Sequence, residues 1–256
     1  MLEDSVDSAP GQGLLDDQQR IKSDLATWFK SYKASRVHFQ AQLGVVPKIG
    51  YQLLFLHYIM ANILADTCLK PDDEMAFDSH GNGFASIIAH SFKVLEGVRA
   101  VHNSNNPVFR SGSELFFFSA DIGWAPPLYY TALHCRIHHI RLQAIRLLRA
   151  IPSKEGIWDS RFAASVAEEV MRIEEGNHYN DVTDDDESLF ASLPQHRDLS
   201  RPTLPESCRV YHVRIVLPDG SSGKAFLTCK RGKTYSDSED ITREYDVGRQ
   251  AWIAKD

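Results

Sequence analysis

The stretch from residue 123 to residue 176, GWAPPLYYTALHCRIHHIRLQAIRLLRAIPSKEGIWDSRFAASVAEEVMRIEEG, decides the fold. Its two prolines, Pro126 and Pro127, suit the first turn of a helix, where a missing N–H costs no helical hydrogen bond. Apolar residues then recur at helical spacing, at Leu133, Ile137, Ile140, Ala144, Leu147 and Ile151. The opposite side carries His134, His138, Arg141 and Arg149. This pattern predicts one amphipathic helix over residues 128–151, of roughly six turns, with a solvated polar face.

A second helix is predicted in the same stretch. Pro152 and Gly156 interrupt the first pattern, and Asp159 or Ser160 then offers an N-cap. The apolar stripe that follows consists of Phe162, Val166, Val170 and Ile173. Gly176 stands where a helix of this length would take its C-cap.

Further helical patterns precede this stretch. One stripe runs through Ile21, Leu25, Trp28, Phe29 and Tyr32. Pro47 and Gly50 are interpreted as a break before an apolar core helix at residues 51–65, which is interrupted by polar residues and too short to span a bilayer. Residues 78–83 are interpreted as a loop, and a further helix is expected from Phe84 to Val98.

The character of the chain changes downstream. Residues 208–217 alternate in polarity, which predicts a strand with Val210, His212, Arg214 and Val216 on one face. A turn-rich cluster at residues 218–223 and a second strand at residues 224–230 complete a β-hairpin. Trp252 and Ile253 are expected to add a short strand or to dock on the helices.

The predicted fold is therefore mainly α, a multi-helix domain with a small C-terminal β-hairpin. We expect a disordered, acidic N-terminus at residues 1–13 and a helical domain at residues 14–176. An acidic linker is expected at residues 177–204, followed at residues 205–256 by the hairpin and a tail that pack on or beside the helices.

Composition narrows the class of protein. The 256 residues carry a net charge of −6, with no strong basic patch of the kind that a free-standing nucleic-acid binder uses. The four cysteines are scattered, which favours free thiols in a reducing compartment over disulfides or a zinc site. The polar N-terminus does not resemble a secretory signal. We expect a soluble intracellular protein without a membrane span, a metal or a cofactor.

Several linked motifs resemble the C-terminal half of fungal zinc-cluster transcription factors. In order along the chain these are the Pro-Pro-Leu-Tyr start at residues 126–129, Cys135-Arg136, the segment at residues 144–148, the Glu-Gly-x-Trp-Asp-Ser corner at residues 155–160, the helix at residues 163–175, and Pro205-Glu206 with Arg209-Val210. The resemblance covers about residues 110–230 and implies a mostly helical regulatory region in a nuclear protein.

Two departures from the family pattern limit what the resemblance implies. The family reads DNA through six closely spaced cysteines that hold two zinc ions, and residues 1–67 contain no cysteine. The chain is therefore either a piece of a longer protein or a stand-alone relative that does not bind DNA itself. The family's Asp-Pro after Cys-Arg is replaced by Ile137-His138, from which we expect continued helix instead of a turn.

The candidate chemistry is sparse. His134 and His138 have a spacing that could share a metal, but a third ligand is missing and a solvated face is the simpler interpretation. The acidic pairs Glu168-Glu169 and Glu174-Glu175 are likewise interpreted as solvated. Acidic and apolar residues mix at residues 184–190, as in activation segments, but a plain solvated linker is the favoured interpretation.

Three hypotheses follow. The first is a regulatory protein of a fungal metabolic or biosynthetic pathway, nuclear or cytoplasmic, that acts through protein partners, a homodimer or a small-molecule effector. The second is an enzyme of fungal secondary metabolism, a cyclase or isomerase for an apolar substrate, whose catalytic candidates would be Asp121, Tyr129, Tyr130, His134 and Arg136. The third is a remnant that only dimerises.

Overall fold

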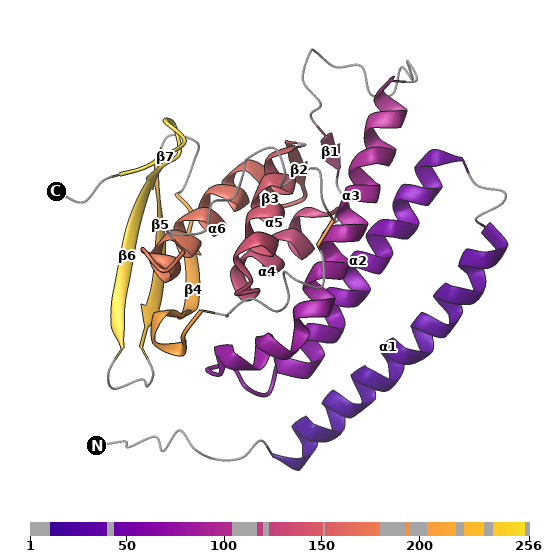
Figure 1. Ribbon diagram of the computed structural model, residues 1–256, viewed down its shortest axis with the longest axis horizontal. Helices are drawn as coiled ribbons and strands as arrows, with labels where there is room; N and C mark the ends of the chain where they lie inside the picture. The colour runs from indigo at the N-terminus through magenta and orange to yellow at the C-terminus, as the bar shows by residue number, and fades with distance from the viewer. Residues whose placement is uncertain are drawn as a thin grey trace.

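The computed structural model has six α-helices and a C-terminal antiparallel sheet of four strands within the residues that it describes (Figure 1). The described residues are 11–39, 44–103, 117–119, 123–150, 152–179, 193–194, 204–218, 223–232 and 238–253. The mainly α prediction is thus confirmed, and the sheet is larger than the predicted hairpin. Most of the predicted linker and residues 1–10 of the predicted disordered N-terminus lie outside the described residues.

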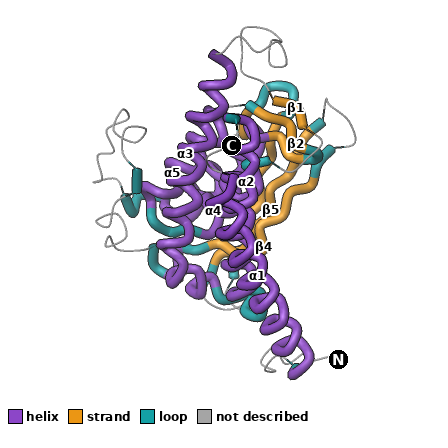
Figure 2. The backbone as a smooth tube through the Cα atoms, turned by 90° about the vertical axis from the view of Figure 1, so that its right-hand side faces the viewer, coloured by secondary structure: helices purple, strands orange, loops and turns teal. Residues whose placement is uncertain are grey.

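The first two helices, α1 (Gln12–Phe39) and α2 (Val45–Thr67), pair through aromatic side chains. Phe29 stacks on Tyr58 with ring centroids 4.6 Å apart, and the Tyr32 hydroxyl donates to the Tyr51 carbonyl at 3.0 Å. Figure 2 shows α1 extending beyond the other helices at its N-terminal end. The predicted break at Pro47 is wrong, because Pro47 lies in the first turn of α2, where proline is tolerated.

The predicted loop at residues 78–83 is also wrong. A 3₁₀ helix, η1 (Glu74–His80), leads directly into α3 (Gly81–Asn103). The Asp73 carboxylate caps η1 by accepting hydrogen bonds from the backbone N–H groups of Met75 and Ala76. This cap stabilises a helical backbone in a segment whose glycines had indicated a loop.

The single helix expected over residues 128–151 is two helices, α4 (Ala125–His134) and α5 (His138–Ala150). Cys135 has extended backbone angles, φ −80° and ψ 123°, and ends α4. The chain therefore turns at Cys135–Ile137 although it lacks an Asp-Pro at this position, and the expectation of continued helix is wrong. This break allows Arg136 to leave the helical direction and enter the interior, as the contacts below show.

A small sheet formed by β1 (Phe117–Ser119), β2 (Ser153–Glu155) and β3 (Trp158–Asp159) precedes α6 (Ser160–Glu175). Both predicted caps of α6 are confirmed. The Asp159 side chain accepts from the N–H groups of Arg161 and Phe162, and Gly176 ends the helix with φ 47°. The Glu155 carboxylate accepts from the N–H groups of Gly123 and Ala125 at 3.1 and 3.0 Å, so it caps the start of α4.

The C-terminal sheet has the order β4-β5-β6-β7, all antiparallel, with β4 (Val210–Val216), β5 (Lys224–Arg231), β6 (Glu239–Asp246) and β7 (Ala251–Trp252). The predicted hairpin is the pair β4–β5, and Trp252 adds the short strand β7. The register of β4 shifts between Tyr211 and Arg214, with His212 at φ 52°. Because this bulge reverses the alternation, the predicted shared face is wrong: Val213 and Ile215 pack on the core, whereas Val216 is exposed.

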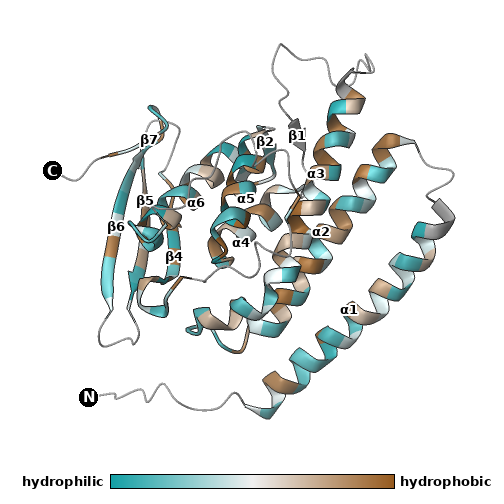
Figure 3. Cartoon of the chain, viewed as in Figure 1, coloured by the Kyte–Doolittle hydropathy of each residue, from teal (hydrophilic) through white to brown (hydrophobic). Residues whose placement is uncertain are grey.

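Two apolar clusters hold these layers together. The larger one joins α2, α3, α4, α5 and α6, and the smaller one packs the sheet onto α6 (Figure 3). In the smaller cluster Val166 and Val170 of α6 lie with Leu227 and Ile241 of the sheet. All four cysteines are free, and none of the described helices combines the length and apolar character that crossing a bilayer requires.

Candidate functional site

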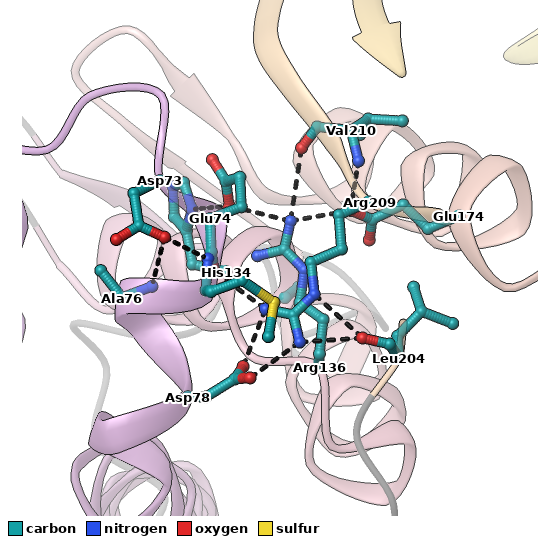
Figure 4. Close-up of polar contacts among 12 residues, drawn as sticks. Asp73, Glu74, Ala76, Asp78, His134, Arg136, Glu174, Leu204, Arg209 and Val210 are labelled. Carbon is teal, nitrogen blue, oxygen red and sulfur yellow. Dashed lines mark hydrogen bonds and ion pairs between the residues drawn. The ribbon is translucent and has the colours of Figure 1, made fainter. Parts of the chain in front are cut away.

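Arg136 lies at the junction between the helices and the sheet. Its side chain is 1% exposed, and its Nη2 atom lies 2.7 Å from Glu174 Oε1 of α6 and 2.9 Å from Glu74 Oε2 of η1. The same Nη2 donates to the backbone carbonyl of Val210 in β4 at 3.4 Å. Figure 4 shows this guanidinium reaching between elements that are far apart in the sequence. One arginine therefore joins η1, α6 and β4.

A second buried arginine, Arg141, shares Glu174 with Arg136. Its Nη2 lies 2.6 Å from Glu174 Oε2, its Nη1 donates to Glu175, and its Nε donates to the Ala132 carbonyl. Burial by itself raises the pKa of the Glu174 carboxyl, but the two guanidiniums and the Val210 N–H outweigh it and leave that pKa below its ordinary value. Glu174 is thus a buried carboxylate that stays charged.

Arg209 fixes the start of the sheet against η1. Its two Nη atoms lie 2.8 Å from the two carboxylate oxygens of Asp78, a bidentate pair. The guanidinium also donates to the backbone carbonyls of Leu204 and Glu74. Arg209 is fully buried, so these bonds replace the water that its charge would otherwise hold.

The two histidines of the predicted pair face different carboxylates. His134 Nδ1 lies 3.4 Å from Glu74, and His138 Nδ1 lies 2.7 Å from Glu175. The pKa of Glu74 is raised by burial, but His134 and Arg136 together bring it below its ordinary value. The break between α4 and α5 separates the two imidazoles, and the described residues hold no cluster of three or more potential metal ligands.

The network is a nearly balanced set of charges, most of them buried, with Glu74 and Asp78 partly exposed. Its cations are three guanidiniums and its anions are four carboxylates, namely Arg136, Arg141 and Arg209 against Glu74, Asp78, Glu174 and Glu175. Such a set is costly to bury, and it favours one geometry because any displacement leaves a charge without its partner. The arrangement orients the sheet on the helices.

The catalytic candidates occupy different places. Asp121 lies outside the described residues. Tyr130 and His134 are brought together, with ring centroids 4.6 Å apart, beside Phe77, and Arg136 meets the same carboxylate, Glu74, as His134. Tyr129 instead packs against Trp158 with centroids 5.4 Å apart.

Burial changes the acidity of both tyrosines. It raises the pKa of Tyr129 above its ordinary value and that of Tyr130 to about 12, the latter against the effect of the nearby Thr67 hydroxyl. Both phenols therefore hold their protons firmly near neutral pH. The enzymatic hypothesis stays a prediction, with Tyr129 on one side of α4 and Tyr130, His134 and Arg136 on the Glu74 side.

The sequence interpretation missed the acidic half of this network. The prediction of solvated glutamates is wrong for Glu169, Glu174 and Glu175, which are buried, and right for the exposed Glu168. The prediction of a solvated Arg141 is wrong for the same reason. A signal was present, because Glu174 follows Val170 by four residues and so continues the apolar stripe of α6.

Comparisons with known proteins add no relative. A scan against protein-family models, a search of the curated proteins and a search of the solved structures each find no match to this chain.

Proposed function

We propose that this chain is a regulatory domain of the kind found in the C-terminal half of fungal zinc-cluster transcription factors. It acts through a protein partner, in the nucleus or the cytoplasm, in the control of a fungal metabolic or biosynthetic pathway, and a small-molecule signal is a second possible input. DNA is read by another chain or segment.

One observation carries this proposal: the motifs behind the resemblance contact one another at both ends of α4, at its first turn and at the junction of helices and sheet beyond its last turn. Pro126 and Pro127 form the first turn of α4, and Glu155 of the corner motif caps that same turn. Arg136 and Arg209, from the second and last motifs, supply two of the three buried guanidiniums. Residues that serve one scaffold explain why these motifs occur together, and the regulatory role itself is proposed from the resemblance.

The charge of the chain supports the separation from DNA. The formal net charge is −6, and the three arginines of the junction are buried against carboxylates. Binding to DNA depends on cations that can replace the counterions of the phosphates. The buried arginines cannot do this without breaking the junction.

The test is a transcription reporter. The chain is fused to a DNA-binding module from an unrelated protein, and output is compared with that of the module alone. A several-fold change in output is expected, and its loss is expected in a fusion that carries Glu174→Gln, which weakens the junction. Unchanged output in the intact fusion would contradict the regulatory role. Sequence-specific, salt-resistant binding by the purified chain in a mobility-shift assay would contradict the absence of a DNA reader.

A further inference from the structure

A groove of about 810 Å³ lies between the start of α6 and one end of the C-terminal sheet. One wall comes from the end of α5, the β2–β3 region and the first turns of α6, and the other comes from Leu217 and Pro218 after β4 and from Tyr245 and Gln250. Two contacts join its walls: Phe162 and Tyr245 meet edge to face at 5.1 Å, and the Trp252 indole N–H donates to the Ser165 carbonyl. The groove is separate from the buried network described above.

The groove is more basic than the chain that contains it. Three cations line it, Arg149, Lys154 and Arg161, against one carboxylate, Asp159. Asp159 is the N-cap of α6 and also lies 3.9 Å from Lys154 Nζ, and Arg149 is paired with Glu168 beside the groove, so three cations face two carboxylates. The N-terminal turn of the 16-residue helix α6 adds the positive end of its dipole at the same place. On a chain of net charge −6, this local excess of positive charge favours an anionic partner.

Large aliphatic side chains stand exposed in the same groove. Ile157 is 94% exposed and Leu217 is 61% exposed, and both line it together with Phe162 and Val247. Exposed aliphatic residues rimmed by charges are a feature of protein interaction sites. A nucleic acid backbone or free phosphate would use the cations but would leave these side chains in water.

We propose that this groove binds an acidic peptide segment of a partner protein, one in which Asp or Glu residues alternate with large apolar residues. The carboxylates lie against Lys154, Arg161 and the start of α6, and the apolar side chains cover Ile157 and Leu217. This inference rests on the proposed regulatory function and names the chemistry of the partner. The bound peptide contacts both α6 and the C-terminal sheet. It therefore bridges the helices and the sheet, which the buried network also joins.

The experiment uses the full chain and a fluorescein-labelled peptide in which Asp and Glu alternate with Leu and Phe, followed by fluorescence anisotropy. Saturable binding is expected, weaker at high salt because the partly exposed ion pairs are screened. In the double variant Lys154→Glu, Arg161→Glu the dissociation constant for the peptide should rise by about tenfold or more. Ile157→Ser should also weaken binding, and a peptide with Lys in place of each acid should not bind.

The matched control is the double variant Arg20→Glu, Lys70→Glu, which makes the same change in net charge at exposed residues elsewhere. It should bind as the unmodified chain does. A glutamate at Arg161 suits the helix dipole, and Ile157 makes almost no buried contact. Lys154→Glu places a carboxylate opposite Asp159 in the β2–β3 pair, so thermal unfolding of the double variant is measured to show that it stays folded. Equal weakening by the control variant, or binding unaffected by Ile157→Ser, would overturn the proposal.

The reporter assay separates this inference from the proposed function. Regulation that persists in the fusion while the peptide fails to bind overturns the groove proposal alone. Duplex DNA or inorganic phosphate is tested in the same way. If either binds, and binding is lost in the Lys154 and Arg161 variant but kept in Ile157→Ser, the groove is an anion site and the peptide proposal is overturned.

Discussion

The backbone N–H of Val210 donates to the carboxylate of Glu174 at 2.9 Å, across 36 residues of sequence. The same oxygen of Glu174 lies 2.7 Å from Arg136. The last turn of α6 and the first residue of β4 therefore share one buried negative charge. This relationship fixes where the sheet begins, and four predictions follow from the residues around it and from the contact that starts α4.

Replacing Glu174 by Gln should strongly destabilise the chain. The change removes the charge that two buried guanidiniums share, and an uncompensated buried charge costs about 3–5 kcal/mol. The free energy of unfolding in urea, followed by circular dichroism, measures the loss. Glu168→Gln is the matched control on the same helix. Since its pair with Arg149 is exposed, a change of less than about 1 kcal/mol is expected there. A similar small change at Glu174 would contradict the network's role.

Acid should weaken the fold through Glu74 and Glu174. Both carboxyls have a pKa below the ordinary value of 4.5 in the folded chain, so the unfolded chain takes up their protons more readily. Their contribution is fully present above that ordinary value and is lost as the pH falls through the lower folded pKa. Urea unfolding at several pH values should therefore show a steep loss of stability below about pH 4.5. In Glu174→Gln this loss should be smaller, and an identical slope in the two proteins would argue against the assignment.

The sequence predicts these helices better than it predicts their charges. Apolar spacing predicted α6, because Val166 and Val170 face the sheet as a regular stripe. Residue type predicted its two caps, since Asp159 and Gly176 are strong local signals. Local pattern could not locate the turn at Cys135, since that break serves contacts of Arg136 with residues 38 and 74 positions away. Burial of charge depends on partners that only the folded chain brings together.

The β4 strand shows the same limit for strands. Alternation predicted its position, but one extra residue at the Tyr211–Arg214 bulge exchanges the two faces beyond it. A two-residue period cannot reveal a bulge, because the pattern is equally regular on either face.

Replacing Arg209 by Lys should loosen the start of the sheet although the charge is kept. Lysine cannot form the bidentate pair with Asp78 or reach the Leu204 and Glu74 carbonyls at the same time. We expect a loss of about 2 kcal/mol and faster hydrogen exchange in β4 and η1. Arg249→Lys, at a side chain that is 86% exposed, is the control and should leave both measurements unchanged. Exchange that rises evenly over all helices would show a global effect and contradict a local one.

The same substitution, Gly to Ala, should have opposite effects at Gly123 and at Gly50. A Cβ atom at Gly123 would stand 2.5 Å from the Glu155 carboxyl carbon, whose oxygens cap the start of α4. Gly123→Ala must therefore displace Glu155 from the N–H groups of Gly123 and Ala125, and a loss of about 1–2 kcal/mol is expected from the broken cap. Gly50 lies within α2, with nothing within 4 Å of the added Cβ, so alanine there should stabilise the chain by about 0.5–1 kcal/mol. The measurement is the thermal unfolding temperature of each variant compared with that of the unmodified chain. Helix propensity alone gives no reason for Gly123→Ala to lower that temperature. Two shifts of the same sign would show that Glu155 yields without cost and that its cap contributes little to holding α4.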